Sequence, residues 1–582
     1  MARLSPDHWG KDLLARFVRA RLRPNRADAV ALALIGAGLV LLAHGAREMD
    51  GPLAQLQAAP ISLDPGRLPE YALRTVLRMF AALACSLVFT FLVATLAAKS
   101  RKAEMVIAPA LDILQSVPVL GFLTFTVTSF MGLFPGRELG VECAAIFAIF
   151  TSQAWNMAFS FYQSLRTLPA DLDEVARQFH LSPWRRFWRL EAPFGTPALV
   201  WNAMMSMSGG WFFVVASEAI TVGNTQIMLP GIGSYLSLAI SQQDFHAVGW
   251  AVLAMGVVIA LYDQLLFRPI VAWADRFRFE QTASQDPPRS WFYDILRHTR
   301  FLQRLGRLIG GVIEKLPRVP PSKRAERPAP PLVVNRAIDI VWIALVVGFT
   351  IWGAWSVVRF VTAHLSWREV GAAFGLGLFT LVRVLVLIAL ASVVWVPIGV
   401  WIGLRPKWTE RIQPVAQFLA AFPANVLFPF FVIAIVALKL DPNVWLSPLM
   451  ILGTQWYILF NVIAGASALP TELKEAASMF GMRGWHRWRD FILPGIFPFY
   501  VTGALTASGG SWNASIVAEV ASWGSTHLEA AGLGSFIAKA TADGDYPRVA
   551  LGIAVMAIFV VLINRVLWRP LYAFAERRLR LN

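Results

Sequence analysis

Hydrophobic residues along this chain are gathered into long runs, several of them about 20 residues long, which is enough to cross a bilayer as a helix. Six runs occupy the first half, near residues 27–46, 74–98, 106–133, 140–165, 197–222 and 247–268. A second set follows from about residue 337 to residue 568. The pattern therefore predicts an all-α membrane protein with about 12 spans.

The second set of runs is a copy of the first. Residues 168–176 align without gaps on residues 469–477 at an offset of 301, and the same offset places Glu218 on Glu519. Upstream the offset is 305, which places Arg78 on Arg383 and implies a four-residue length change in a loop. We expect two six-helix transmembrane domains in tandem, at residues 1–273 and 336–582, with a linker at residues 274–335.

Basic residues follow alternate spans. Within the first half they cluster at residues 99–102, 166–189 and 268–278, after the second, fourth and sixth spans. Positive loops remain in the cytoplasm, so these loops predict one orientation. An even number of spans in each half then makes the two halves parallel and leaves both termini cytoplasmic.

The composition is typical of a membrane protein, and this affects how the net positive charge is interpreted. The chain is 57% hydrophobic and 15% charged, and its net charge is +16. In a soluble protein such a charge would suggest a nucleic-acid partner. Here much of it falls in loops and in the linker, where it faces anionic membrane lipid, so nucleic acid is not needed to explain it.

The linker has two parts. Residues 291–316 place apolar side chains at roughly helical intervals among arginines, which suits a helix lying on an anionic membrane surface, although a solvated tether fits equally well. Residues 317–331 are rich in proline and are expected to be extended.

The loop after the fourth span carries the clearest signal. Each copy places four apolar residues at i, i+3, i+4 and i+7, which predicts a short helix with one apolar stripe. Acidic residues occupy its first turns, and Gly481 suits a left-handed stop in the second copy. The stripe residues are Leu172, Val175, Ala176 and Phe179 in the first copy, and Leu473, Ala476, Ala477 and Phe480 in the second.

This loop resembles the "EAA" loop of binding-protein-dependent ABC importer permeases of the type I fold. The resemblance rests on Glu475-Ala476-Ala477, on Gly481, and on residues 491–494 (Phe-Ile-Leu-Pro). Residues 455–461, Ala518-Glu519 and the Gly-Leu-Gly of residues 532–534 are similar to the nitrate, sulfonate, taurine and bicarbonate branch of that family. A fused, duplicated permease is a known variety of it.

The resemblance implies that each loop is a coupling helix that docks on a cytoplasmic ATPase. It also implies two ATPase copies, a periplasmic or lipid-anchored solute-binding protein, and a place in the bacterial inner membrane. The first copy departs at Val175, at His180 and at Leu190–Pro193, so we expect its contact to be weaker or different. The implied coupling residues are Glu174, Ala176, Phe179, Glu475, Ala476, Ala477, Phe480 and Gly481.

No motif for chemistry is present. A G-x-x-x-x-G-K-[ST] phosphate loop is missing, since Gly10-Lys11 is followed by Asp12, and neither H-E-x-x-H nor G-x-S-x-G occurs. We therefore expect a transport component that is not an enzyme and binds no cofactor or metal, with ATP and Mg used by the partner ATPase. The alternative is a secondary transporter with 6+6 parallel repeats. The sequence leaves the substrate open among nitrate, sulfonates, bicarbonate and an uncharged heterocycle.

Polar residues inside the spans are candidates for the pathway, because hydrocarbon makes them costly. Arg78 and Arg383 are expected either to reach the outer headgroups or to form a layer with Glu218 and Glu519 at the outer gate. A second set either lines the path or packs helices together. It comprises Ser206, Ser208, Trp211 and Ser217 in the first half, and Ser508, Ser511, Trp512, Asn513 and Ser515 in the second.

Overall fold

The computed structural model describes residues 61–114, 119–222, 225–277, 290–299 and 332–578, with the single positions 36, 40 and 49. These residues fall into two compact units. The smaller unit takes its described residues from 1–46, 164–201 and 261–330, and the larger unit from 47–163, 202–260 and 331–582. The domain limits predicted from the repeat, at residues 273 and 336, remain a prediction.

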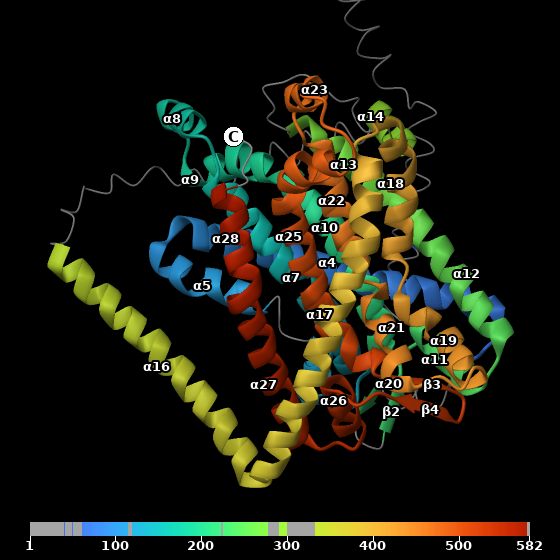
Figure 1. The fold of residues 1–582 in the computed structure, drawn as a ribbon. Coiled ribbons are helices and arrows are strands. Elements are labelled where there is room, and N and C mark those ends of the chain that lie inside the picture. The colour runs from blue at the N-terminus through green and yellow to red at the C-terminus, as the bar shows by residue number, and fades with distance from the viewer. Residues whose placement is uncertain are drawn as a thin grey trace, which may run out of the picture. The chain divides into compact units, whose positions relative to one another are not determined.

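The first repeat is almost entirely helical (Figure 1). Its described elements are η1 (Pro65–Arg67), α4 (Leu68–Lys99), α5 (Arg101–Leu114), α6 (Val119–Leu133), α7 (Glu138–Arg166), α8 (Ala170–Gln178), α9 (Pro183–Arg186), η2 (Phe187–Glu191), α10 (Ala192–Glu218), β1 (Ala219–Val222), β2 (Thr225–Met228), α11 (Ile232–Ser241), α12 (Phe245–Tyr262), η3 (Asp263–Phe267), α13 (Arg268–Ala274) and η4 (Asp275–Phe277). The linker contributes α14 (Trp291–His298), and the remainder of the predicted linker helix and the proline-rich part lie outside the described residues.

The second repeat is also almost entirely helical, and from α23 to α27 it follows the order of α8 to α12 in the first. It comprises α16 (Leu332–His364), α17 (Trp367–Gly403), α18 (Pro406–Ala421), η5 (Ala424–Leu427), α19 (Phe428–Ala437), α20 (Pro442–Trp445), α21 (Ser447–Leu452), α22 (Gln455–Ser467), α23 (Thr471–Met479), α24 (Gly484–Arg487), η6 (Trp488–Ile492), α25 (Leu493–Ala518), β3 (Val520–Trp523), β4 (Thr526–Glu529), α26 (Leu533–Ala542), α27 (Tyr546–Ile563), η7 (Asn564–Trp568) and α28 (Arg569–Arg578).

The fold class predicted from the sequence is confirmed. Within the described residues, seven helices are long and apolar enough to cross a membrane, and two bent helix pairs raise the number to nine. The predicted span at 140–165 is the 29-residue helix α7, which carries Glu138 and Glu142 and is not among the nine. The predicted span at 27–46 lies outside the described residues apart from positions 36 and 40.

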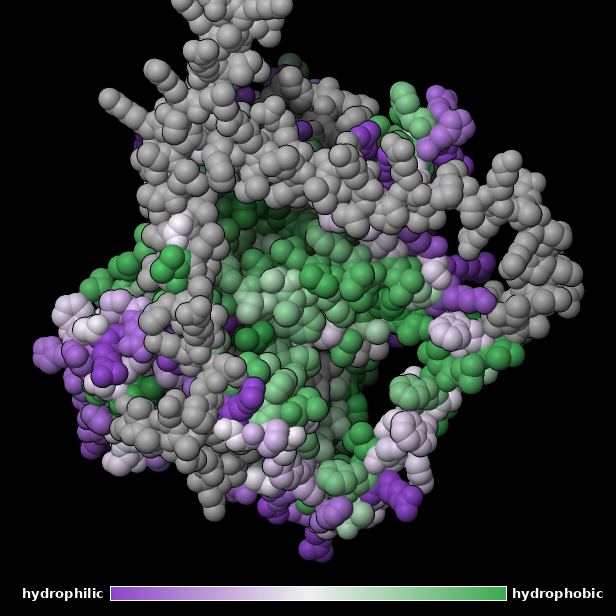
Figure 2. Space-filling view, turned by 180° about the vertical axis from the view of Figure 1, so that it is seen from behind, coloured by the Kyte–Doolittle hydropathy of each residue, from purple (hydrophilic) through white to green (hydrophobic). Residues whose placement is uncertain are grey.

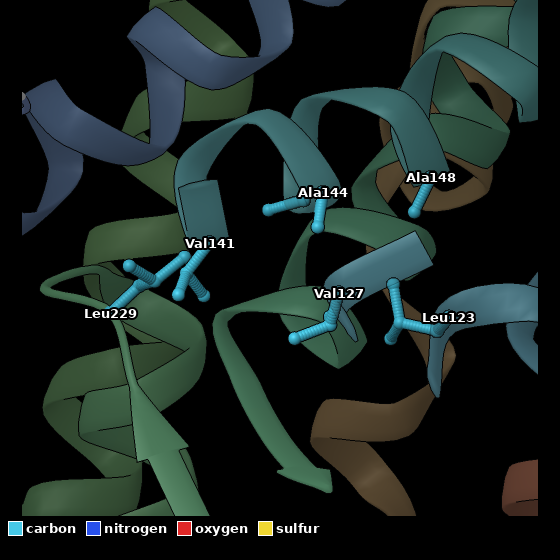
Figure 3. Packing of buried hydrophobic residues seen from close by; sticks show 7 residues of the cluster. Leu123, Val127, Val141, Ala144, Ala148 and Leu229 are labelled. Atoms are coloured by element: carbon cyan, nitrogen blue, oxygen red, sulfur yellow. The ribbon is translucent and has the colours of Figure 1, made fainter. Parts of the chain in front are cut away.

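Helices of both repeats share one core in the larger unit. Helix α25 packs against α17, α22 and α26, and α6 of the first repeat also contacts α25, α26 and α27. Figure 3 shows one part of this core, where Leu123 and Val127 of α6 face Val141, Ala144 and Ala148 of α7. Small side chains on α7 allow the two helices to approach closely.

Large apolar side chains also cover much of the exterior. Leu390, Val393 and Val394 of α17 are each more than half exposed, and Figure 2 shows hydrophobic residues gathered over the middle of one face. A soluble surface does not carry apolar patches of this extent, whereas lipid-facing helices require them.

Two antiparallel hairpins interrupt the helical pattern. β1 pairs with β2 and β3 pairs with β4, each directly after a long helix, α10 or α25. Glu218 is the last residue of α10, and Glu519 is the C-terminal cap of α25. The hairpins therefore return the chain to these two carboxylates, where the candidate site is built.

Candidate functional site

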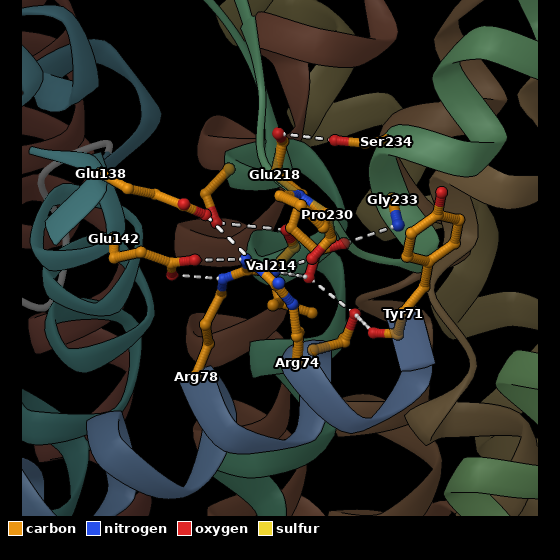
Figure 4. A network of polar contacts seen from close by, with 12 residues as sticks. Tyr71, Arg74, Arg78, Glu138, Glu142, Val214, Glu218, Pro230, Gly233 and Ser234 are labelled. Carbon is orange, nitrogen blue, oxygen red and sulfur yellow. Dashed lines mark hydrogen bonds and ion pairs between the residues drawn. The ribbon is translucent and has the colours of Figure 1, made fainter. Parts of the chain in front are cut away.

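Arg78 of α4 lies at the centre of a buried ion-pair cluster in the larger unit (Figure 4). Its Nη1 donates to Glu218 Oε1 at 2.7 Å, while Nε and Nη2 donate to the two carboxylate oxygens of Glu142 at 2.6 and 2.5 Å. The side chains of all three residues are fully buried. Paired, hydrogen-bonded geometry of this kind is what keeps a buried guanidinium tolerable.

The Glu218 carboxylate also joins α4 to the start of α11. Thr75 Oγ1 donates to Glu218 Oε1 at 2.7 Å and accepts from the Ile232 N–H at 3.1 Å, and the Gly233 N–H donates to Glu218 Oε2 at 2.6 Å. A carboxylate is favourable here because the first N–H groups of a helix have no partner within the helix.

The second repeat builds a related cluster around Arg383 and Glu519. Arg383 Nη1 donates to Glu519 Oε1 at 3.2 Å, and Thr380 Oγ1 donates to the same oxygen at 2.8 Å. The Leu533 N–H donates to Thr380 Oγ1 at 2.9 Å, and the Ser535 N–H donates to Glu519 Oε2 at 3.0 Å. The same joint between three elements therefore occurs twice.

Glycine makes both joints possible. A Cβ atom on Gly231 would lie 2.3 Å from the Glu218 carboxylate, and one on Gly532 would lie 2.2 Å from the Glu519 carboxylate. Real Cβ contacts are not this short, so a side chain at either position would displace the carboxylate. The first glycine of each Gly-x-Gly is thus explained by close approach to a buried carboxylate. The second is explained by close approach to backbone, since a Cβ on Gly233 would lie 2.6 Å from Val215 O and one on Gly534 would lie 2.3 Å from Ser515 O.

The two clusters differ in charge. The first contains a second ion pair, Arg74 Nη1 to Glu138 Oε1 at 3.3 Å, besides the Glu142 contact. At the upstream offset of 305 Arg74 corresponds to Phe379, while Glu138 and Glu142 lie in the stretch where the offset changes from 305 to 301. Within the described residues Arg383 makes an ion pair with Glu519 alone, and its side chain is 13% exposed where that of Arg78 is fully buried.

The proposal that Arg78 reaches the outer headgroups is wrong, because its guanidinium is fully buried between two carboxylates. Arg383 is also held by a buried carboxylate rather than extended to the surface. Both arginines pair with the glutamates that the repeat offset assigned to the same layer. Whether this layer is a gate remains a proposal.

Sequence reasoning missed Thr75, Thr380 and Glu142. The two threonines are related by the same offset of 305 as the arginines, so the alignment contained the signal that could have found them. Glu142 could not be found in this way, because it lies where the repeat offset changes by four residues and neither Asn443 nor Ser447, its two possible counterparts, is acidic.

The serine and tryptophan set lies within the core of the larger unit. Trp211 and Trp512 are fully buried, and the Trp512 ring stacks on Phe559 at 6.3 Å between centroids. Most of the polar groups donate to a backbone carbonyl of their own helix: Ser208 to Met204, Ser217 to Val214, Ser511 to Ala507, Asn513 to Gly509 and Ser515 to Trp512. Ser508 is buried, with 2% of its surface exposed. Ser206 and Ser511 also bond to neighbouring helices, which supports the packing role.

The predicted coupling residues lie in two loop segments of matching backbone. The first loop segment (residues 170–191) contains α8, α9 and η2, and the second (residues 471–492) contains α23, α24 and η6. Glu174 and Glu475 are exposed, Ala476 is half-buried, and Ala176 and Ala477 are buried.

An apolar side chain projects from the end of each short helix. Phe179 is 74% exposed and Phe480 is 83% exposed, although both are large and hydrophobic. His180 and Gly481 follow them with positive φ. Exposed aromatic residues of this kind are typical of a surface that binds a protein partner.

Among the described residues, no group of three or more His, Cys, Asp or Glu side chains is arranged to hold a metal ion. The buried charges of each cluster join the ends of neighbouring helices. They can therefore fix α4 against α11 in the first repeat and α17 against α26 in the second, or release them when the bonds break.

Comparison with known proteins gives a consistent match over both repeats. A family model described as "Binding-protein-dependent transport system inner membrane component" matches residues 58–268 and 395–581. The chain is 22% identical over 271 residues to the bicarbonate transport system permease protein CmpB of Synechococcus elongatus, covering 44% of this chain and 91% of that protein.

Two further relatives have different stated substrates. The nitrate import permease protein NrtB of Leptolyngbya laminosa is 25% identical over 185 residues, covering 32% of this chain and 63% of that protein. The glycine betaine/carnitine transport permease protein GbuB of Listeria monocytogenes is 25% identical over 169 residues, covering 29% of this chain and 54% of that protein.

Proposed function

The chain belongs to the family of inner-membrane components of binding-protein-dependent transport systems, and from this premise we propose that it provides both transmembrane halves of an ABC importer for a small anion. Two copies of a separate ATPase drive transport, using ATP and Mg, and a periplasmic or lipid-anchored binding protein delivers the solute. The observation that carries the proposal is the duplicated loop segment, which presents an exposed Glu and an exposed Phe at the same place in each repeat.

The orientation follows from the position of these segments. Both are flanked by basic residues, so they are assigned to the cytoplasm together with both termini. In the larger unit, Figure 1 shows α23 and the hairpin β3–β4 at opposite ends of the helices. The cluster at Glu519, which adjoins that hairpin, is then on the outer side.

The anion class is supported by the names of two relatives, a bicarbonate and a nitrate permease, while the betaine permeases among the relatives widen the choice. The Arg383 cluster supports an anion as well, because its guanidinium is partly exposed and has one carboxylate partner. We assign the two Arg–Glu clusters to the outer gate, where their ion pairs set the spacing of the helix ends.

Reconstitution tests this function. The chain, its ATPase and its binding protein are placed in proteoliposomes, and uptake of nitrate, bicarbonate and taurine is measured with and without ATP. ATP-dependent uptake of one of these anions is the expected result. Uptake driven by an ion gradient in the absence of the ATPase would support the secondary transporter instead.

The two loop segments are tested separately by Glu174→Ala and Glu475→Ala. Both are exposed carboxylates on short helices, so neither change should unfold the chain. Loss of transport-coupled ATP hydrolysis in both variants is expected if both segments dock. Loss in Glu475→Ala alone would show that the first segment does not couple.

A further inference from the structure

The two loop segments share one backbone. Helix α8 corresponds to α23, α9 to α24 and η2 to η6, with the ends of all three related by 301 residues. Side chains at matching positions therefore occupy matching places relative to their own segment. Differences in their charges are differences in what each segment can bind.

A chain of ion pairs closes the first segment on itself. Arg186 Nη2 lies 2.5 Å from Asp173 Oδ1 on α8, and Arg186 Nε lies 3.0 Å from Glu191 Oε1 in η2. The Glu191 side chain is 5% exposed, so this arginine is held between two carboxylates of which one is buried. The ion pairs tie the short helix to the base of α10.

The second segment keeps the arginine and loses both carboxylates. Arg487 corresponds to Arg186, whereas Lys474 stands at the position of Asp173 and Ile492 at that of Glu191. Asp490 of the same segment pairs with other residues, since its carboxylate lies 3.1 Å from His486 Nδ1 and 3.6 Å from Arg489 Nε. A place that holds a salt bridge in one copy thus holds two cations in the other.

These two cations lack a partner within the part of the chain that the structure describes. The Arg487 guanidinium and the Lys474 ammonium make no ion pair there, and the buried Nε of Arg487 donates no hydrogen bond, whereas Arg186 has two carboxylate oxygens within 3.0 Å. Partial burial lowers the pKa of Lys474. Half-buried cations without counter-charge are unfavourable, so a carboxylate supplied from outside would be stabilising.

We propose that the second loop segment receives an acidic side chain of the ATPase subunit between Lys474 and Arg487, in the place that Asp173 and Glu191 fill within the first. This inference rests on the proposed function. It makes the two docking sites unequal: the first segment pairs its arginine with its own carboxylates, and the second recruits the partner's carboxylate. The exposed Met479 and Phe480 supply the apolar part of the same surface.

Binding of the purified ATPase subunit to the chain in nanodiscs tests the charge pairing. Arg487→Gln and Lys474→Asp should each weaken binding by about tenfold at low salt and make binding less dependent on salt. The first change removes the cation that pairs with the ATPase carboxylate, and the second supplies a carboxylate from within the segment to pair with Arg487. Arg487→Lys should restore part of the affinity. The matched control is Arg489→Gln, whose side chain is 70% exposed and already pairs with Asp490.

A zero-length carbodiimide cross-link identifies the partner. This reagent joins an amine to a contacting carboxylate, so Lys474 should form an amide with an acidic residue of the ATPase, and Lys474→Arg should abolish that product. Wild-type affinity and salt dependence in both Arg487→Gln and Lys474→Asp would overturn the inference. So would an effect seen only in nanodiscs containing phosphatidylglycerol, which would assign the cations to lipid phosphate.

The binding measurements also distinguish failure of this inference from failure of the proposed importer function. If the wild-type chain binds no ATPase, the importer proposal fails and the inference fails with it. If wild type binds and the charge variants bind equally well, only the inference fails.

Discussion

His180 and Gly481 occupy the same left-handed position at the ends of α8 and α23, with φ of 49° and 65°. In both copies the next residue closes the helix: the Leu181 N–H donates to Ala176 O at 3.1 Å, and the Met482 N–H donates to Ala477 O at 3.0 Å. These are the bonds of a Schellman C-cap. The departure of the first repeat from the glycine pattern therefore changes the residue and not the backbone.

His180→Gly should stabilise the first loop segment. A histidine with positive φ carries a steric cost that glycine avoids, so we expect a gain of about 1 kcal/mol in local stability, or about fivefold slower amide exchange in α8. Hydrogen exchange followed by mass spectrometry measures this. Gly481→His is the reciprocal change and should speed exchange in α23 by a similar factor. Unchanged exchange in both variants would contradict the cap assignment.

Gly231→Ala and Gly532→Ala should each destabilise the larger unit by about 1–3 kcal/mol, because the new methyl group overlaps a buried carboxylate. Backbone strain is not the cause, since φ at these glycines is extended, at 179° and −166°. Thermal unfolding in detergent measures the loss. Gly249→Ala is the control, because a Cβ there meets nothing within 4 Å. Equal melting temperatures for all three variants would contradict the close approach.

Arg78→Gln should cost more stability than Arg383→Gln. The first change leaves Glu142 and Glu218 buried without their counter-charge, a situation that typically costs about 3–5 kcal/mol. The second removes one ion pair of a side chain that is 13% exposed, so its cost should be smaller. Thermal unfolding of the two variants compares them directly, and the reverse order would contradict the assigned partners.

Arg383→Gln also tests the gate. If the partly exposed guanidinium attracts the anion, uptake should fall and the preference among anions should change while the chain remains folded. The same proteoliposome assay reports both. Uptake and substrate preference identical to wild type would remove Arg383 from the pathway.

The sequence carried the architecture and the symmetry of this site, but not its details. The repeat offsets placed Arg78 with Arg383 and Glu218 with Glu519, and the structure pairs each arginine with a glutamate of that layer. It could not reveal that Glu142 holds Arg78, because side chains from different helices meet only in the packed fold. For a related reason α7 is not among the helices apolar enough to count as a span: polar residues that the fold buries lower the hydropathy of its sequence.

Phe480→Ala should separate docking from folding. The Phe480 side chain is 83% exposed, so its truncation should change the free energy of unfolding by less than about 0.5 kcal/mol. Loss of a central aromatic anchor at a protein interface typically costs about 2 kcal/mol or more, which predicts ATPase binding weaker by about 30-fold. Phe379→Ala is the control, because Phe379 is 61% exposed on α17, away from the loop segments in sequence. Weaker ATPase binding by Phe480→Ala, with unchanged melting temperature and an unaffected Phe379→Ala, is the expected result. Equal binding by both variants would mean that the exposed end of α23 faces lipid or solvent instead of the ATPase.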